Sequence, residues 1–168
     1  MSSQKLRYFL IVLGVFIGTR SGPCGRCATP GQKSAGKPLE FRLVMMGETI
    51  DDGATKAGFR SDGLPLVHLG FVKYEASDGE KLTFREGGFG SPEGAKRYLD
   101  WKVAASSKIL EQGIKADSKG KPVGYRAVVL LAPDQKESAV MWTNGAFFRQ
   151  IIAKSLADAE ELEKRSGH

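Results

Sequence analysis

Cysteine and histidine are scarce in this chain of 168 residues, which has two of each. Cys24 and Cys27 both lie near the N-terminus, so residues 39–168 have no cysteine with which to form a disulfide. Their C-x-x-C spacing has no second pair and no following histidine, and it therefore lacks the remaining ligands of a zinc or c-type haem site. We expect a domain that folds without a disulfide, a metal or a cofactor.

Four sequence motifs that carry chemistry are also missing. The glycine-rich run 87–94 follows a predicted strand, but Glu93 holds the third glycine position of G-x-G-x-x-G and no G-K-[ST] follows. Ser91 lacks the flanking glycines of G-x-S-x-G, and the acidic residues at 51–53 lack the distal ligands of a calcium loop. We interpret 87–94 as a strand exit that leads into a helix, and 51–53 as a turn.

Positive charge is not concentrated in the part of the chain that we expect to fold. The whole chain has 25 Lys and Arg against 19 Asp and Glu, a formal charge of +6. Residues 1–28 contain four of these bases and no acid, which leaves 21 bases against 19 acids, or +2, in residues 29–168. A nucleic-acid binder needs clustered bases, interleaved with aromatic residues where it binds single strands. We therefore expect no nucleic-acid partner.

Residues 1–28 have the layout of a secretory signal peptide. Lys5 and Arg7 precede an uncharged apolar run from Tyr8 to Gly18, which is shorter than the roughly 20 residues that span a bilayer as a helix. We expect cleavage within 21–28 and a secreted or periplasmic product. The alternatives are an uncleaved anchor, which would be the chain's one contact with a membrane, and an ordinary buried segment.

The remaining residues divide into a linker and a single domain. Residues 29–38 are rich in Gly, Pro, Ser and Lys, and they predict a flexible linker, whereas residues 39–168 show no internal repeat. Alternating or continuous apolar runs bounded by turn residues predict strands in this domain. These strands are expected at 41–46, 67–74, 81–86, 114–117, 123–132, 138–143 and 146–153.

Two helices are expected between and after these strands. Ser91, Pro92 and Glu93 are typical of a helix start, and apolar residues at helical spacing extend this helix to about Glu111. Ser155 begins a short C-terminal helix. Strands grouped before and after one long helix predict an α+β fold. We expect a mostly antiparallel sheet of about six to seven strands, one long amphipathic helix packed on it and a short C-terminal helix.

The strongest local pattern in the sequence is the hairpin at 144–145. Asn-Gly between two apolar runs favours a tight turn in which glycine adopts a positive φ. Trp142 precedes this turn on an apolar face and is expected in the core. The segments 125–131 and 146–152 are apolar on both faces, which predicts central strands that are covered on both sides. Arg126 and Arg149 interrupt these segments, so each is expected at a sheet edge or in an ion pair.

The segment 47–65 is the candidate binding site. It reads as a long polar loop, although a short strand around 48–50 could be hidden in it. Phe59 and Arg60 offer an apolar anchor beside a fork of hydrogen-bond donors, with Asp62 and His68 nearby. The alternative places Phe59 in the core.

These observations predict an exported binding or assembly module whose partner is an unknown small ligand or protein. A hydrolase built from the 47–65 loop and His68 is the alternative. His68 would need an orienting carboxylate and a nucleophile within reach, and no motif supplies them. We therefore assign no catalytic residue and favour the binding module over the enzyme.

Overall fold

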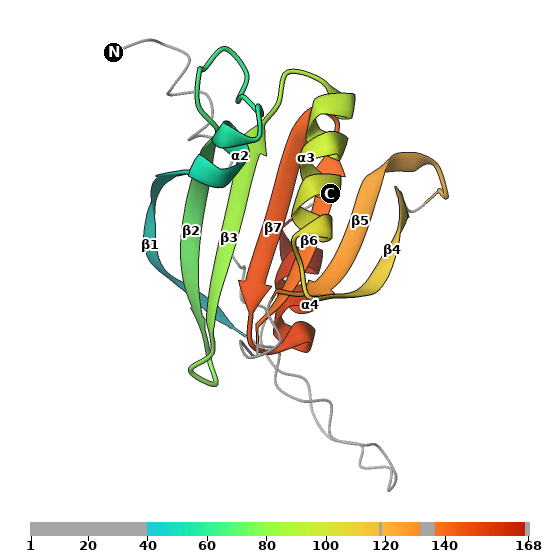
Figure 1. The fold of residues 1–168 in the computed structure, drawn as a ribbon. Helices are drawn as coiled ribbons and strands as arrows, with labels where there is room; N and C mark the ends of the chain where they lie inside the picture. The colour runs from blue at the N-terminus through green and yellow to red at the C-terminus, as the bar shows by residue number, and fades with distance from the viewer. Residues whose placement is uncertain (1–39, 118, 132–136, 167–168) are drawn as a thin grey trace, which may run out of the picture. The chain divides into compact units, whose positions relative to one another are not determined.

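The computed structural model describes residues 40–117, 119–131 and 137–166. These residues form one seven-stranded sheet and three helices (Figure 1). The strands are β1 (Phe41–Ile50), β2 (His68–Ala76), β3 (Lys81–Gly88), β4 (Lys108–Ala116), β5 (Pro122–Leu130), β6 (Ser138–Asn144) and β7 (Phe147–Ala153). The helices are α2 (Asp52–Lys56), α3 (Pro92–Ala104) and α4 (Leu156–Arg165).

The predicted signal peptide and linker lie outside the described residues. Within the described ranges, no helix has the length and apolar character that crossing a membrane requires.

The sheet is antiparallel throughout and has the order β1-β2-β3-β7-β6-β5-β4. Each of the two meanders, β1–β3 and β4–β7, is built from neighbouring strands that follow one another in sequence. They join because the last strand, β7, pairs with β3, from Thr83 opposite Ile152 to Gly88 opposite Phe147. Helices and an antiparallel sheet confirm the predicted α+β class.

The predicted hairpin at 144–145 is confirmed between β6 and β7. Asn144 pairs with Phe147, and Gly145 has a φ of 56°, a conformation that favours glycine in a tight turn. Trp142 is fully buried, as expected. This hairpin places β7 at the middle of the sheet.

The long helix expected to reach Glu111 is not present, because α3 ends at Ala104. The Ser106 hydroxyl donates to the carbonyl of Val103, and the backbone N–H of Ser107 donates to Leu130 across the sheet. Hydrogen bonding of this kind competes with helix continuation. The residues that follow form β4, whose pairing with β5 overrides the local apolar spacing that favoured a helix.

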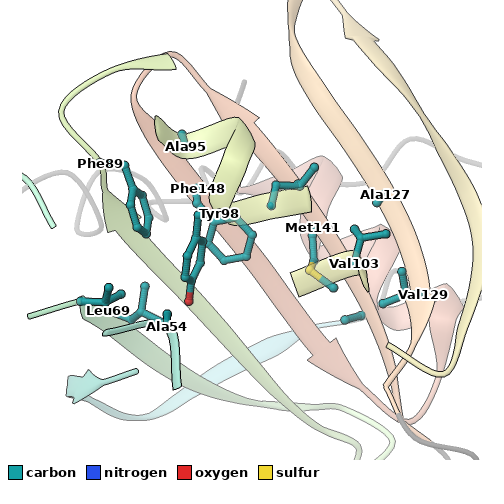
Figure 2. Close-up of a cluster of buried hydrophobic side chains, with 13 residues drawn as sticks. Ala54, Leu69, Phe89, Ala95, Tyr98, Val103, Ala127, Val129, Met141 and Phe148 are labelled. Carbon is teal, nitrogen blue, oxygen red and sulfur yellow. The ribbon is translucent and has the colours of Figure 1, made fainter. Parts of the chain in front are cut away.

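Two separate cores lie on the two faces of the sheet. The side that α3 covers is called the α3 side, and the opposite side, which α4 covers, is called the α4 side. Figure 2 shows the core of the α3 side, where the Tyr98 ring lies beside Phe89 and Phe148. The core of the α4 side contains Trp142 and Phe84.

The expectation that two apolar strands are central holds for one of them. β7 lies in the middle of the sheet with a core on each side. β5 is next to the edge strand β4, and its first residues, including Val123 and Tyr125, are exposed. The apolar character of β5 therefore does not imply complete burial.

Candidate functional site

The predicted loop at 47–65 is shorter than expected. β1 extends to Ile50, which confirms the hidden strand at 48–50, and α2 follows at once. Asp51 caps α2, because its side chain accepts a hydrogen bond of 2.9 Å from the N–H of Ala54. The acidic residues at 51–53 therefore begin a short helix instead of forming a simple turn.

Phe59 is packed against α3. Its ring centroid lies 5.6 Å from that of Tyr98 in an edge-on arrangement and 5.6 Å from that of Trp101, and the Arg97 guanidinium lies 5.9 Å from it. Phe59 is partly buried against the core of the α3 side. These contacts are those of the alternative interpretation, in which Phe59 stabilises the fold, while its role in binding stays a prediction.

The other three predicted site residues lie around the same loop. The Arg60 guanidinium donates to the carbonyls of Thr55 and Phe59, at 2.8 Å and 2.6 Å. These hydrogen bonds link the segment after α2 to the end of that helix. Asp62 is exposed. His68 begins β2 opposite Ile50.

Phe59, Arg60, Asp62 and His68 do not form a connected set. Among the described residues, no hydrogen bond or ion pair joins their side chains, and no ion pair links the His68 imidazole to a carboxylate. The orienting acid that the hydrolase alternative requires is therefore not provided by the described part of the chain.

A second group of polar residues lies on the α3 side of β3 and β7. Arg85 alternates with Phe84, which packs in the core of the α4 side, so the Arg85 side chain projects to the α3 side. Gln150 alternates in the same way with Ile151. The register places Arg85 directly between Gln150 on β7 and Phe71 on β2. We call Arg85 and Gln150 the Arg85 site.

Both residues of the Arg85 site have a buried polar atom without a partner. Gln150 is 3% exposed and its Oε1 accepts no hydrogen bond within the described residues. The Nε–H of Arg85 is also buried and donates to none of them. Leaving such groups unpaired costs about 1–3 kcal/mol each, and more for a charged one. Unpaired buried polar groups in a folded protein therefore suggest a role other than stability.

Arg85 also lacks a counter-charge. Among the residues that the structure describes, it forms no ion pair, whereas Arg126 and Arg149 each form one with buried carboxylates. Arg85 is only partly exposed, so water screens its charge incompletely. An uncompensated guanidinium in such a place favours binding of an anion.

The cluster of Asp51, Tyr98 and Lys102 lies near Arg85. The Asp51 carboxylate accepts a hydrogen bond of 2.7 Å from the Tyr98 hydroxyl and lies 2.6 Å from the Lys102 ammonium. Figure 2 shows the Tyr98 hydroxyl directed toward Ala54 and Leu69. Arg85 is close enough to Tyr98 for its charge to act on the hydroxyl.

The ionisation of this cluster favours a structural role. Burial, reinforced by the hydrogen bond to Asp51, raises the pKa of Tyr98 far above its ordinary value, although the Arg85 charge opposes the rise. Burial alone would raise the pKa of Asp51 too, but hydrogen bonds from Lys102, Ala54 and Tyr98 hold it below its usual value. Near neutral pH, Tyr98 therefore stays protonated and Asp51 stays ionised, and neither is poised for proton transfer.

The residues on the α3 side of β2 and β3 are not all buried: Arg85 and its register partner Phe71 are both half-buried. Lys73 lies on the same side of β2, is exposed, and has its ammonium 5.7 Å from the centre of the Phe71 ring. Lys73 and Arg85 carry positive charge on this side of the sheet, whereas Lys102 and Asp51 pair with each other.

The α4 side has a charged cluster of its own, and its members are paired. Arg126 donates to Glu163 through Nε and Nη2 at 2.9–3.1 Å, and Lys115 lies 3.1 Å from the same carboxylate. Arg149 lies 2.6 Å from Glu86, its partner in the register. The expectation that Arg126 and Arg149 form ion pairs is confirmed. The ion pairs of Arg126 and Lys115 with Glu163 join α4 to the sheet.

Comparison with known proteins identifies no relative of this chain: no family model, no curated protein and no solved structure matches it. Among the described residues, no group of three or more His, Cys, Asp or Glu side chains is arranged to hold a metal ion.

Proposed function

We propose that this chain is a binding protein for a small polar ligand, and that the ligand binds at the Arg85 site. The observation that carries the proposal is that two residues directly paired in the sheet, Arg85 and Gln150, each have a buried polar atom, Nε and Oε1, with no partner among the described residues. One ligand that carries both an acceptor and a donor would satisfy both atoms. We also propose, from the apolar run in residues 1–28, that the chain is exported and acts in the periplasm or outside the cell.

Binding is favoured over catalysis by the groups that surround the site. A hydrolase needs a base that gains and loses a proton near the working pH. The pKa of Tyr98 is raised and that of Asp51 is lowered, so both groups hold one protonation state around neutrality. The Lys102 ammonium is bound to Asp51. The chemistry that remains at the Arg85 site is recognition by hydrogen bonds and charge.

Ligand-binding residues that are unpaired in the free protein lower its stability, which gives a test that needs no ligand. Arg85→Met and Gln150→Met replace the two polar groups by apolar ones of similar length. We expect the double variant to be more stable than the ligand-free parent by about 1–2 kcal/mol, because two unpaired buried atoms are removed. Urea unfolding of the purified full chain measures this difference.

Arg149→Met is the matched control for this experiment. Arg149 lies on the same sheet and has a comparable length, but it pairs with the buried Glu86. Its replacement leaves a carboxylate unpaired and is expected to cost about 3 kcal/mol. If Arg85→Met and Gln150→Met destabilise the chain as Arg149→Met does, the two polar groups serve folding and the proposed function is wrong.

A further inference from the structure

We propose that the edge of the sheet at β1 binds the surface of a membrane that contains anionic phospholipids. From the sequence, residues 1–28 are the one expected contact with a membrane, so the folded domain would provide a second contact. This contact uses exposed residues of β1, β2 and β3 and not the Arg85 site. It is therefore independent of the proposed function.

Three consecutive apolar residues are exposed on β1, which is an edge strand of the sheet (Figure 1). Leu43, Val44 and Met45 are 49%, 56% and 44% exposed. The pairing with β2 shifts between Leu43 and Met45, so Val44 has no partner in β2 and forms a β-bulge. Leu43 lies opposite Tyr74 of the α4-side core, whereas Met45 lies opposite Lys73 on the α3 side. The apolar side chains therefore project to both sides of this edge.

The α3 side of the sheet next to these apolar residues has more bases than acids. Arg42, Lys73 and Lys81 are exposed there, on β1, β2 and β3. On this side of the three described strands, the one acid is Glu75, which pairs with Arg42. The described residues as a whole contain as many acids as bases, so the positive charge is a local feature of this face.

The turn between β2 and β3 contains two further acids, and their charge acts on the other side of the sheet. Burial raises the pKa of Asp158 on α4, and the charges of Asp78 and Glu80 raise it further. The Glu80 carboxylate also accepts a hydrogen bond of 2.7 Å from the backbone N–H of Lys154. Both acids therefore lie toward α4, and the α3 side keeps its excess of bases.

A fluid anionic surface fits this combination better than an added strand does. A strand paired with β1 would lie in the plane of the sheet, and it would not reach the Lys73 and Lys81 side chains on the α3 side. Apolar side chains on both sides of an edge instead fit a surface that deforms around them, as the headgroup region of a bilayer does. The bases beside them attract anionic headgroups. Because the backbone of an open edge needs water, the contact stays at the depth of the headgroups.

Hydrogen exchange of the full chain, measured by mass spectrometry with and without vesicles, tests this contact. An uncleaved leader would also attach the chain to vesicles, so the amides of β1 are compared with those of β4, the other edge strand. Vesicles of equal parts phosphatidylcholine and phosphatidylglycerol should slow exchange in β1 severalfold, because the bound surface restricts opening of the edge. Exchange in β4 should not change, and vesicles of phosphatidylcholine alone should change neither strand.

The contribution of charge is measured with Lys73→Glu/Lys81→Glu. The vesicle concentration that half-protects β1 should rise at least about tenfold, because each base near an anionic surface contributes roughly a fivefold factor in affinity. Lys119→Glu/Lys121→Glu is the matched control, since it changes the net charge equally at two exposed lysines in the turn between β4 and β5. This control should protect β1 as the parent does.

The contribution of the apolar residues is measured with Val44→Ser/Met45→Ser, which should weaken the protection of β1 severalfold without changing any charge. Ile109→Ser/Leu110→Ser on β4 is the matched control, because these residues are 49% and 44% exposed on the opposite edge. It should bind the vesicles as the parent does.

The possible contrary results are distinct. The proposal is overturned if the mixed vesicles leave exchange in β1 unchanged, or if phosphatidylcholine alone protects β1 equally. Equal protection of β4 also overturns it. If poly-glutamate protects β1 and the vesicles do not, the face binds an acidic polypeptide and not a lipid surface. If a control pair weakens protection as much as its test pair, net charge or general apolar exposure controls binding, and this face does not.

Discussion

A close approach between β5 and β6 depends on a single glycine, Gly124. A Cβ atom built on Gly124 would lie 2.1 Å from the carbonyl oxygen of Thr143, which is far inside van der Waals contact. The next residue, Tyr125, donates its N–H to the Thr143 hydroxyl at 3.0 Å. The backbone of β5 thus passes the end of β6 at a distance that only a residue without a side chain permits.

Gly124→Ala should destabilise the chain by about 3 kcal/mol, because the added methyl group must displace backbone instead of a flexible side chain. Gly113→Ala on β4 is the control, since a Cβ there meets nothing within 4 Å. We expect the control to stay within about 0.5 kcal/mol of the parent. Thermal unfolding followed by circular dichroism measures both variants, and equal melting temperatures would contradict the close approach.

Single residues differ in how far the sequence predicts their surroundings. Asn144-Gly145 was predictable because a tight turn is decided by neighbours in sequence. The requirement at Gly124 is set by Thr143 on another strand, and the sequence shows no sign of it. The surroundings of Arg85 cannot be predicted from the sequence for the same reason, because they depend on β7, which pairs with β3 from far along the chain.

Among the elements, α4 is held to the sheet by charge as well as by apolar packing. Glu163 is buried among Arg126 and Lys115, while Ala159 and Leu162 enter the core of the α4 side. Burial alone would raise the pKa of Glu163, but the bonds to Arg126 and Lys115 outweigh it and hold that pKa below its usual value. The carboxylate is therefore ionised in the folded protein at every pH at which it is ionised in the unfolded chain.

Glu163→Gln should lower the stability of the chain by about 3 kcal/mol at neutral pH, because Arg126 and Lys115 each lose the charge of a buried carboxylate. Glu161→Gln is the control: Glu161 lies on the same helix, and its ion pair with Arg165 is more exposed, so its loss should cost less than about 0.5 kcal/mol. Urea unfolding at pH 7 compares the three proteins. A loss in Glu161→Gln equal to that in Glu163→Gln would contradict the assigned role.

The same pair of variants carries a prediction about acid. Because the pKa of folded Glu163 is lowered, its contribution is complete above the pKa of a glutamate in the unfolded chain, about 4.3, and is lost as the pH falls through the lower folded value. The stability difference between the parent and Glu163→Gln should therefore shrink below about pH 4. A difference that does not change down to pH 2 would mean that the carboxylate charge is not what holds α4.

The sequence predicts the start of a helix well, because a capping residue acts on its neighbours in the chain. It predicts poorly where a helix gives way to a strand, because that boundary depends on pairing with another strand. Ser155 begins α4 and Ser91 begins α3, as the capping patterns indicated. The predicted end of α3 at Glu111 is wrong, because Ile109 and Leu110 have helical spacing relative to the apolar residues before them. These residues belong to β4, and only the pairing of β4 with β5 shows this.

At the scale of the whole molecule, the order of elements along the chain was predictable and their order in the sheet was not. Alternation and turn residues indicate hairpins between successive strands, but the pairing of β3 with β7 joins segments that a helix and three strands separate. This pairing brings Arg85 beside Gln150 and so creates the candidate site. The loop at 47–65 was chosen from sequence because a loop can be recognised locally, and a pair of strand residues cannot.

The outer edge of the sheet at β4 predicts how the whole molecule behaves in solution. β4 is an edge strand that is exposed over nearly its whole length, and Ile114 is 67% exposed beside Tyr125 on β5. An open edge strand with apolar side chains is a template for pairing between molecules, which a lysine at the edge disfavours.

Ile114→Lys should therefore slow aggregation of the heated protein severalfold and leave the melting temperature unchanged, because little buried surface is lost. Gln112→Lys, on the same side of β4, adds the same charge without removing an apolar group. Light scattering at constant temperature compares the two variants with the parent. If Gln112→Lys slows aggregation as much as Ile114→Lys does, net charge and not the apolar edge controls association, and if neither variant slows it, aggregation proceeds through another surface.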